Sequence, residues 1–488
     1  MYDGLRFFTW LHFAALAGLL VYGAHRLLFV FCWLGERRKR ENNAPPSMTE
    51  FPFVTVQLPL YNERFVAARL IEAAARIDWP AEKLEVQVLD DSTDDTRGIV
   101  DETAARLSLR GTNISVIRRE GREGYKAGAL KHGMTMAKGE FMAIFDADFL
   151  PRPDFLVRAM PHFFRPETGM VQARWSFLNA ESSWLTRLQS LLLGPHFRIE
   201  HLVRFKRGLY FNFNGTAGVW RRKAVESAGG WQSDTVTEDL DLSYRAQLCG
   251  WKFVYLDEVS VPSELPVTLA AFRSQQQRWA KGSVQTARKV LPLIFSSSLP
   301  ASVKFEAAAH LLANVCWLFG TATTLTLYSA VSLRAGAGPH LLLKTDVLML
   351  AAASCAVLSY FYVYIRVRGD GHSIGSLLLL PVFSIGMSPA ISLSVVKGFF
   401  KDGGFFERTP KFGVLGRQSV PNPALLYRQS AFPYLMMNAL FLAYSVPPVL
   451  FAWQRGAWTA IPFLALFPAG FTLVIAKDLA DMKRAGDD

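Results

Sequence analysis

Long apolar runs fill the first 35 and about the last 180 residues of the chain, while short apolar runs alternate with polar stretches between them. The long runs reach the roughly 20 residues that a helix needs to cross a bilayer. The first run lacks a small-residue cleavage site after a short core, so it is interpreted as a retained anchor. The pattern predicts membrane segments at Phe7–Leu34, Phe305–Leu333, Asp346–Ile365, Ile374–Val396, Phe432–Trp453 and Trp458–Ala476.

The fourth of these segments contains Pro381, Gly386 and Pro389, which interrupt the hydrogen bonding of a helix unless neighbouring helices satisfy the freed groups. If all six segments crossed, the loop Lys397–Gln429 would lie outside the cell with six basic and two acidic residues. That contradicts the positive-inside rule. We therefore expect a re-entrant or interfacial fourth segment and five crossings; the alternative is six crossings with an exported basic loop.

The hydrophobic content of 51% and the net charge of +12 fit a membrane protein with basic clusters beside its apolar segments. The cluster Glu36–Arg40 places the following domain in the cytoplasm, and the charge distribution argues against nucleic-acid binding. The four cysteines lie far apart, without disulfide or zinc spacing. The chain is expected to be a multi-pass protein of the inner (plasma) membrane. Its parts are an N-terminal anchor (1–35), a basic linker (36–50), a large cytoplasmic domain (51–300), transmembrane or interfacial helices (301–476) and a short cytoplasmic tail (477–488).

The central region has the pattern of an α/β domain. Short β-branched runs such as "FVTVQLPLYNE", "LEVQVLDDSTDD" and "FMAIFDADF" alternate with amphipathic stretches, which predicts βαβ units and a mainly parallel, Rossmann-like sheet. Ligands bind beyond the carboxyl ends of such strands. The strands before Asp91 and before Asp146 both end in acidic clusters there, which favours a metal-bridged anionic ligand.

Asp146 and Asp148 are spaced so that a turn can present both carboxylates to one ion. Mg²⁺ or Mn²⁺ is the expected cofactor, because both prefer oxygen ligands. By itself such a pair is more often a solvated turn, but its position directly after the strand "FMAIF" favours the metal site. The glycine-rich "GREGYKAGAL" adds Arg122 and Lys126 at a helix start, where cations and helix amides can meet a diphosphate; an ordinary turn is the alternative.

The cluster "TEDLDL" begins at Thr237. Thr237 is expected at a helix N-cap with Glu238 in the first turn, where acidic residues are favourable. Asp239 is a candidate general base that could accept a proton from an incoming hydroxyl.

Taken together, these motifs resemble those of the family 2 glycosyltransferases, and more narrowly of the cellulose-synthase-like mannan and glucan synthases. The resemblance covers about Phe51 to Gly282 and follows the order "PLYNE", "LDDSTDDT", "GREGYKAGAL", "FDADF", "FNFNGTAGVWR", "TEDLDL" and "QQQRW". It implies a GT-A-type catalytic domain joined to α-helical transmembrane segments. The tract "ERTPKFG" from Glu407 also resembles a cytoplasmic segment of bacterial members, which favours keeping that loop inside.

The resemblance also implies roles for individual residues. Asp239 would be the base, and Asp146 and Asp148 would hold the metal and the donor, with Asp148 preferred for direct coordination. Donor and nucleotide binding would further involve Tyr61, Glu63, Asp91, Lys126 and Arg278, and acceptor binding Asn214, Gly215, Thr216, Glu238, Gln275 and Trp279.

The implied activity is inverting transfer of glucose or mannose from UDP-glucose or GDP-mannose to a growing β-linked polysaccharide. Such a hexosyltransferase is expected to be processive and to pass the polymer through its own membrane helices, with helper subunits left open. One alternative is a single transfer to a membrane lipid. A nucleotide-binding transporter or receptor is another, but it gives no role to the base or to Trp279.

The stretch "SQQQRWAKG" is expected to form a helix on which Gln275, Arg278 and Trp279 occupy neighbouring sides. Trp279 offers a flat apolar face to a sugar ring, and Arg278 can fork onto a diphosphate. Gln276 and Gln277 fall outside the signature and are interpreted as spacers. His310 and Asn314, in the first segment after the domain, either line a sugar path or pack between helices.

Overall fold

The computed structural model describes residues 2–37, 48, 50–335, 340–368, 374–404, 408–416 and 431–484. Most of the predicted basic linker, residues 36–50, lies outside the described residues. So do Glu407 and the end of the loop that was expected at Lys397–Gln429.

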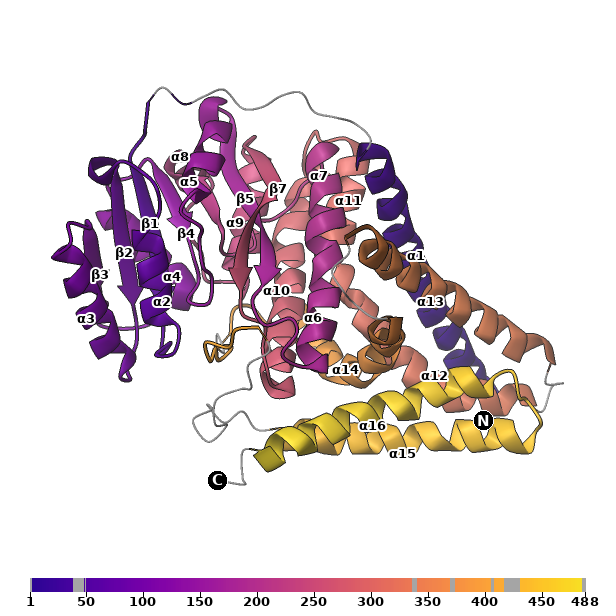
Figure 1. Cartoon of the computed structure of the whole chain (residues 1–488). Helices are drawn as coiled ribbons and strands as arrows, with labels where there is room; N and C mark the ends of the chain where they lie inside the picture. The colour runs from indigo at the N-terminus through magenta and orange to yellow at the C-terminus, as the bar shows by residue number, and fades with distance from the viewer. Residues whose placement is uncertain are drawn as a thin grey trace.

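A sheet of seven strands forms the centre of the region before the C-terminal membrane helices, in the order β3-β2-β1-β4-β6-β5-β7 (Figure 1). Six strands run in one direction and β6 runs against its neighbours β4 and β5. The predicted mainly parallel α/β sheet is therefore confirmed, with one antiparallel strand that the pattern did not predict. The strands are β1 (Val54–Leu60), β2 (Leu84–Asp90), β3 (Ile114–Ile117), β4 (Phe141–Ile144), β5 (Thr168–Phe177), β6 (Gly218–Arg221) and β7 (Lys252–Ser263).

Helices cover both faces of the sheet, which is why the central strands are apolar at nearly every position. One core joins the sheet to α2 (Ala67–Ala75), α3 (Thr96–Ser108) and α5 (Phe155–Ala159). A second core on the opposite face joins it to α4 (Tyr125–Met136), α8 (Arg222–Ser227) and α9 (Glu238–Leu248). Short helices η1 (Ala81–Lys83), η2 (Met160–Phe164) and η4 (Ala313–Val315) complete the connections.

Two long helical stretches lie between the sheet and the membrane helices (Figure 1). One consists of α6 (Trp184–Pro195), the π-helical η3 (His196–His201) and α7 (Leu202–Lys206). The other is α10 (Leu269–Ser296), which contains the stretch "SQQQRWAKG". Both pack into one apolar cluster with the membrane helices, so they connect the two halves of the molecule.

Within the described residues, five helices are long and apolar enough to cross a membrane: α1, α13, α14, α15 and α16. A bent pair, α11 and α12, passes the same test when it is taken as one span. The bounds are α1 (Tyr2–Arg37), α11 (Ala301–Leu311), α12 (Cys316–Ala335), α13 (His340–Arg368), α14 (Ile374–Phe400), α15 (Phe432–Gln454) and α16 (Ile461–Arg484). The last of these continues past the domain boundary that was expected at Ala476.

The fourth segment, which was expected to be re-entrant or interfacial, contains no break. Despite its two prolines, α14 is a continuous helix of 27 residues. Gly386 packs against the backbone of Gly470 on α16, where a Cβ would come within 2.3 Å of the Gly470 carbonyl, and such close packing supports a proline-containing helix. The bend, of 48°, lies instead between α11 and α12, inside the predicted segment Phe305–Leu333.

Candidate active site

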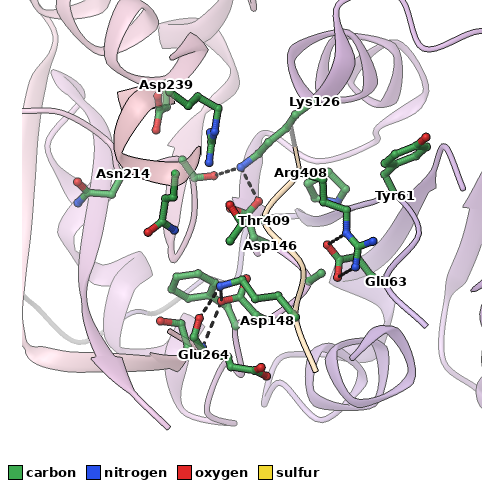
Figure 2. A pocket seen from close by; sticks show the side chains of 18 of the residues that line it. Tyr61, Glu63, Lys126, Asp146, Asp148, Asn214, Asp239, Glu264, Arg408 and Thr409 are labelled. Carbon is green, nitrogen blue, oxygen red and sulfur yellow. Dashed lines mark hydrogen bonds and ion pairs between the residues drawn. The ribbon is translucent and has the colours of Figure 1, made fainter. Parts of the chain in front are cut away.

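A cleft of about 170 Å³ opens at the carboxyl edge of the sheet. Tyr61 follows β1, Asp91 follows β2 and Asp146 follows β4, so the parallel strands bring all three side chains to one edge. Because β6 is antiparallel, the residues before it reach the same edge, and these include Asn214 and Gly215. Figure 2 shows the resulting ring of carboxylates and cations.

Lys126, at the start of α4, connects two walls of the cleft. Its ammonium group contacts Asp146 Oδ1 and donates to the Gly215 carbonyl at 2.8 Å (Figure 2). Burial alone would lower the pKa of Lys126, but the attraction of Asp146 and Glu238 raises it above its ordinary value. Lys126 therefore remains a cation at neutral pH, as a diphosphate contact requires.

Asp148 has its own cationic partner. Lys411 Nζ lies 2.8 Å from Asp148 Oδ2 and also donates to the Glu264 carbonyl. The Glu264 amide donates to the same aspartate oxygen at 3.2 Å. Asp148 is thus held between the end of β7 and a loop more than 250 residues further along the chain.

The two aspartates fit a divalent ion that shares its ligands with a substrate. Among the described residues, no three His, Cys, Asp or Glu side chains lie close enough together to hold a metal ion by themselves. Mg²⁺ usually takes only one or two carboxylates and completes its shell with phosphate oxygens and water. Asp146 and Asp148 match that number, whereas a fully protein-bound metal centre does not fit.

Asp239 lies at the second position of α9. Its Oδ1 accepts a hydrogen bond from the Leu240 amide at 2.8 Å. Burial raises the pKa of Asp239 to about 7, and the charge of Glu238 adds to this rise while Lys126 opposes it. A carboxylate with a pKa near neutrality is suited to accept a proton. Thr237 occupies the N-cap position as expected, but its side chain makes no capping hydrogen bond.

The predicted acceptor tract divides into two kinds of residue. Asn214 and Gly215 line the cleft, whereas Thr216 is fully buried and its hydroxyl accepts a hydrogen bond from the Asp146 amide at 2.9 Å. Gly215 has a φ of 80°, and a Cβ there would lie 2.8 Å from Asp239 Oδ2. Its lack of a side chain therefore permits both the turn and the approach of Asp239.

Three residues expected to lie near the nucleotide all line the cleft, and each contacts an arginine: Tyr61, Glu63 and Asp91. The Arg122 guanidinium carbon lies 3.3 Å from the centre of the Tyr61 ring. Arg119 contacts Asp91 with two nitrogens, and Arg408 donates to both oxygens of Glu63 at 2.8 and 2.9 Å. Burial raises the pKa of Glu63 to about 7, against the opposing effect of Arg408.

Sequence reasoning missed several residues that line the cleft: Trp175, Glu264, Arg408, Thr409 and Lys411. The last three lie in the tract "ERTPKFG", from which only the side of the membrane on which the loop lies was inferred. Its two cations beside a proline and a glycine were the available signal for an anion-binding loop. Trp175 and Glu264 lie in and directly after strands, without a distinctive local pattern.

The contacts of Arg408 and Lys411 place this loop on the same side of the membrane as the sheet. The α11–α12 pair, α13 and α14 separate the loop from the catalytic region in the chain. An even number of these three must cross, because the chain returns to the side from which it left. This parity favours five crossings in all and argues against an exported basic loop.

Helix α10 brings Gln275, Arg278 and Trp279 to the cleft. Burial lowers the pKa of Arg278, while the charges of Glu238 and Asp239 oppose this change. The interpretation of the other two glutamines as spacers is not supported. Gln276 lines a neighbouring cavity, and Gln277 donates to the Ala390 carbonyl at 2.9 Å.

That neighbouring cavity, here called the chamber, has a volume of about 320 Å³. Its walls come from the helices α1, α6, η3, α9, α10, α11, η4, α12, α13 and α14, and it includes His310 and Asn314. On one wall, Arg26 of α1 donates to Glu200 of η3 at 2.5 Å. Six residues line both the cleft and the chamber: Trp175, Leu193, Asn214, Thr237, Asp239 and Trp279.

Three non-glycine residues have positive φ angles in the described part of the chain: Asn62, Tyr125 and Ala217. Each lies directly beside a candidate residue. Asn62 separates Tyr61 from Glu63, Tyr125 precedes Lys126, and Ala217 follows Thr216. Such backbone conformations cost about 1–3 kcal/mol each and persist where surrounding structure holds them. Their positions support the assignment of this edge as the functional site.

Gly282 controls how closely α10 approaches the loop before Asp239. A Cβ at Gly282 would lie 2.4 Å from Thr237 side-chain atoms, so Gly282→Ala is expected to destabilise the fold by about 1–3 kcal/mol and to lower activity. Gly98→Ala in α3 is the matched control, because a Cβ there meets nothing within 4 Å. The control should be neutral or stabilising by up to about 1 kcal/mol. Equal melting temperatures for the two variants would contradict this packing.

Comparison with known proteins supports the same region. Residues 52–282 match the sequence profile of the family described as glycosyltransferase like family 2. A probable glucomannan 4-beta-mannosyltransferase 3 of Oryza sativa subsp. japonica is 47% identical over 261 residues, which make up 52% of this chain and 47% of that protein. Probable glucomannan 4-beta-mannosyltransferase 11 of Arabidopsis thaliana is 49% identical over 245 residues, or 49% of this chain and 55% of the relative. The chain spans about half the length of the curated relatives it matches.

Among solved structures, the mannosyltransferase PcManGT from Pyrobaculum calidifontis, in complex with GDP-Man and Mn2+, has a TM-score of 0.57 at 23% identity. The match covers 80% of this chain and 99% of that one, and it shows a shared fold. The predicted resemblance and the GT-A-type fold are thereby confirmed. Residues 52–282 of this chain form a glycosyltransferase family 2 domain.

Proposed function

We propose that this protein transfers a sugar, with inversion, from a nucleotide-activated donor to the end of a β-linked polysaccharide. One observation carries the proposal: Asp239 and Trp279 line both the cleft with the two metal-ligating candidates and the chamber that extends to the membrane helices. A reaction at this junction joins a donor held in the cleft to an acceptor that enters from the chamber.

In the proposed step, an acceptor hydroxyl oxygen attacks the anomeric carbon of the donor sugar. The bond from that carbon to the diphosphate oxygen breaks, Asp239 accepts the hydroxyl proton, and the nucleoside diphosphate leaves. A single displacement converts an α-linked donor into a β-linked product. One carboxylate is enough on the acceptor side, unlike the pair that glycosidases use.

The leaving diphosphate gathers negative charge, and the cleft supplies cations for it. Lys126 and Arg278 are the protein groups placed to stabilise that charge. Asp146 and Asp148 would hold Mg²⁺ or Mn²⁺, which neutralises phosphate oxygens when bound. Lys411 Nζ lies 2.8 Å from Asp148 Oδ2, so an ion bound by Asp148 would compete with this ion pair.

The relatives favour mannose as the transferred sugar. Both curated relatives above are named as probable glucomannan 4-beta-mannosyltransferases, and PcManGT was solved with GDP-Man and Mn2+. We therefore propose GDP-mannose as the main donor of this chain, with UDP-glucose as the alternative. The proposed acceptor is a β-linked mannan or glucomannan end.

We further propose that the protein elongates the polysaccharide processively and that the polymer passes across the membrane. The chamber reaches from Asp239 to Tyr22 on α1 and to Tyr360 on α13, so an acceptor end bound beside Trp279 would point toward the membrane helices. The proposed location is the plasma membrane with the catalytic domain in the cytoplasm. The shape and lining of the chamber give no argument for a particular helper subunit.

Purified full-length protein in lipid nanodiscs, supplied with radiolabelled GDP-mannose or UDP-glucose and Mg²⁺ or Mn²⁺, tests the function. The proposal expects oligomers and polymer that a β-1,4-mannanase shortens. Product that is a single sugar on an extractable lipid would favour the alternative of one transfer to a lipid. Nucleotide binding without any sugar transfer would favour a transporter or receptor.

Trp279→Ala tests the acceptor platform. Stacking of a sugar on the indole is expected to be worth about 1 kcal/mol or more, so we expect the acceptor KM to rise about fivefold or more while the affinity for nucleotide changes little. Trp279→Phe keeps a ring and should retain much of the activity. Equal losses in acceptor use and nucleotide binding would contradict an acceptor role.

A further inference from the structure

Helix α10 presents two opposite faces. Successive residues of an α-helix turn by about 100°, so residues two apart lie on nearly opposite sides and residues four apart on the same side. Gln275 and Trp279 face the cleft. Arg273 and Gln277 therefore face away from the cleft, and both bind membrane helices.

Arg273 is fixed by a buried ion pair with the last helix of the chain. Its Nη2 donates to Asp478 Oδ1 at 2.7 Å and to Oδ2 at 2.6 Å, and the two side chains are 2% and 1% exposed. The guanidinium carbon lies 4.6 Å from the centre of the Tyr434 ring on α15. Breaking such a pair leaves an uncompensated buried charge, so its geometry is strongly held.

A second carboxylate of α16 binds the beginning of α10. Asp481 Oδ2 accepts a hydrogen bond from the Leu269 amide at 2.9 Å, and Lys477 donates to the other oxygen of Asp481. The first amides of a helix have no partner within the helix, and a negative charge near them is favourable. The last turns of α16 thus hold both the first turn of α10 and the turn that follows it.

Gln277 continues the same face one turn further. Its amide nitrogen donates to the Ala390 carbonyl of α14 at 2.9 Å, and its oxygen accepts from the Tyr434 hydroxyl at 3.2 Å. Helices α14, α15 and α16 therefore all bind α10 directly opposite the residues that line the cleft. The partner residues on α14, α15 and α16 lie outside residues 52–282, the part of the chain that matches the family 2 profile.

We propose that Arg273, Gln277, Asp478 and Asp481 are positioning residues, through which the C-terminal membrane helices set the place of Arg278 and Trp279 over the cleft. This inference rests on the proposed function. A displacement of α10 by about 1 Å would misplace the diphosphate and acceptor contacts together, and misplacement on that scale can lower a rate about 10²-fold. The C-terminal membrane helices would then form part of the catalytic machinery in addition to any route for the polymer.

The test uses full-length protein in nanodiscs, with sugar-transfer rates divided by the number of sites that bind labelled GDP. Asp478→Asn is expected to lower kcat at least about tenfold, whereas the donor KM changes less than about threefold. Asp478→Glu keeps the carboxylate and should return kcat to within about threefold of wild type. Tyr434→Phe removes only the hydroxyl that binds Gln277 and should lower kcat about two- to fivefold.

Asp402→Asn is the matched control. Asp402 also pairs with an arginine of α10, Arg288, at 2.8 Å, but it is 76% exposed and far from the cleft-facing turn. Its kcat should stay within about twofold of wild type. Wild-type kcat per GDP site in both Asp478→Asn and Tyr434→Phe would overturn the inference. So would losses confined to the number of GDP sites, because they indicate a role in folding alone. A wild-type protein that binds GDP and transfers no sugar would overturn the proposed function itself, and the inference with it.

Discussion

Asp239→Asn should abolish sugar transfer, with a loss of about 10³-fold or more, and leave nucleotide binding nearly unchanged. The amide keeps the size of the side chain and can still accept from the Leu240 amide, but it cannot take a proton from an acceptor hydroxyl. Asp241→Asn on the same helix is an unsuitable control because it breaks an ion pair with Arg245. Asp154→Asn, at an exposed ion pair with Arg152, is the better comparison and should transfer sugar at the wild-type rate.

The same residue should set the pH dependence of the reaction. Because burial and Glu238 raise the pKa of Asp239 to about 7, the base is protonated below that pH and free above it. We therefore expect kcat/KM to rise as the pH increases through about 7 and then to level off. Removing the neighbouring charge with Glu238→Gln should move the midpoint to lower pH. A flat profile across neutrality in the wild type would argue against Asp239 as the base.

Asp148→Asn is expected to have the second-largest effect. Loss of one of two candidate metal ligands should lower transfer about 10²-fold and raise the concentration of Mn²⁺ needed for half-maximal activity. Wild-type protein should lose transfer in excess chelator and regain it when Mg²⁺ or Mn²⁺ is added back. Undiminished transfer by the wild-type protein in excess chelator would show that the reaction needs no divalent metal ion.

The carboxylates could be predicted because their signal is local. Asp91 and the pair Asp146 and Asp148 each follow a short apolar run directly, and a parallel sheet brings such strand ends together whatever the details of packing. Asp239 was likewise recognisable from the acidic start of its helix. The local sequence around each of these carboxylates therefore determines where it lies in the fold.

The missed residues depend on contacts over long separations. Lys411 reaches Asp148 across 263 positions and Arg408 reaches Glu63 across 345, so no periodic pattern joins them. The same is true of Gln277, whose partners lie on α14 and α15 and gave it no local signature. Thr216, which was expected to bind the acceptor, supports Asp146 across 70 positions, and no local pattern predicts this contact.

The position of the helix bend was not predicted, for a related reason. Prolines in α14 remove backbone hydrogen bonds, which favours a break when the helix is considered alone. The structure keeps α14 continuous because Gly386 lets it pack closely against Gly470 of α16. The bend between α11 and α12 follows no proline within that join, and its position was not predictable from composition.

The most direct test of the central claim is the configuration of the bond that the protein forms. Full-length protein in nanodiscs would be given GDP-mannose labelled with ¹³C at the anomeric carbon, together with Mn²⁺ and a short mannan acceptor, and the product would be examined by NMR. An inverting transfer at the junction of cleft and chamber predicts that the labelled carbon becomes β-linked to the acceptor, and that Asp239→Asn yields none of this product. A labelled α-linkage in the wild-type product would contradict the account.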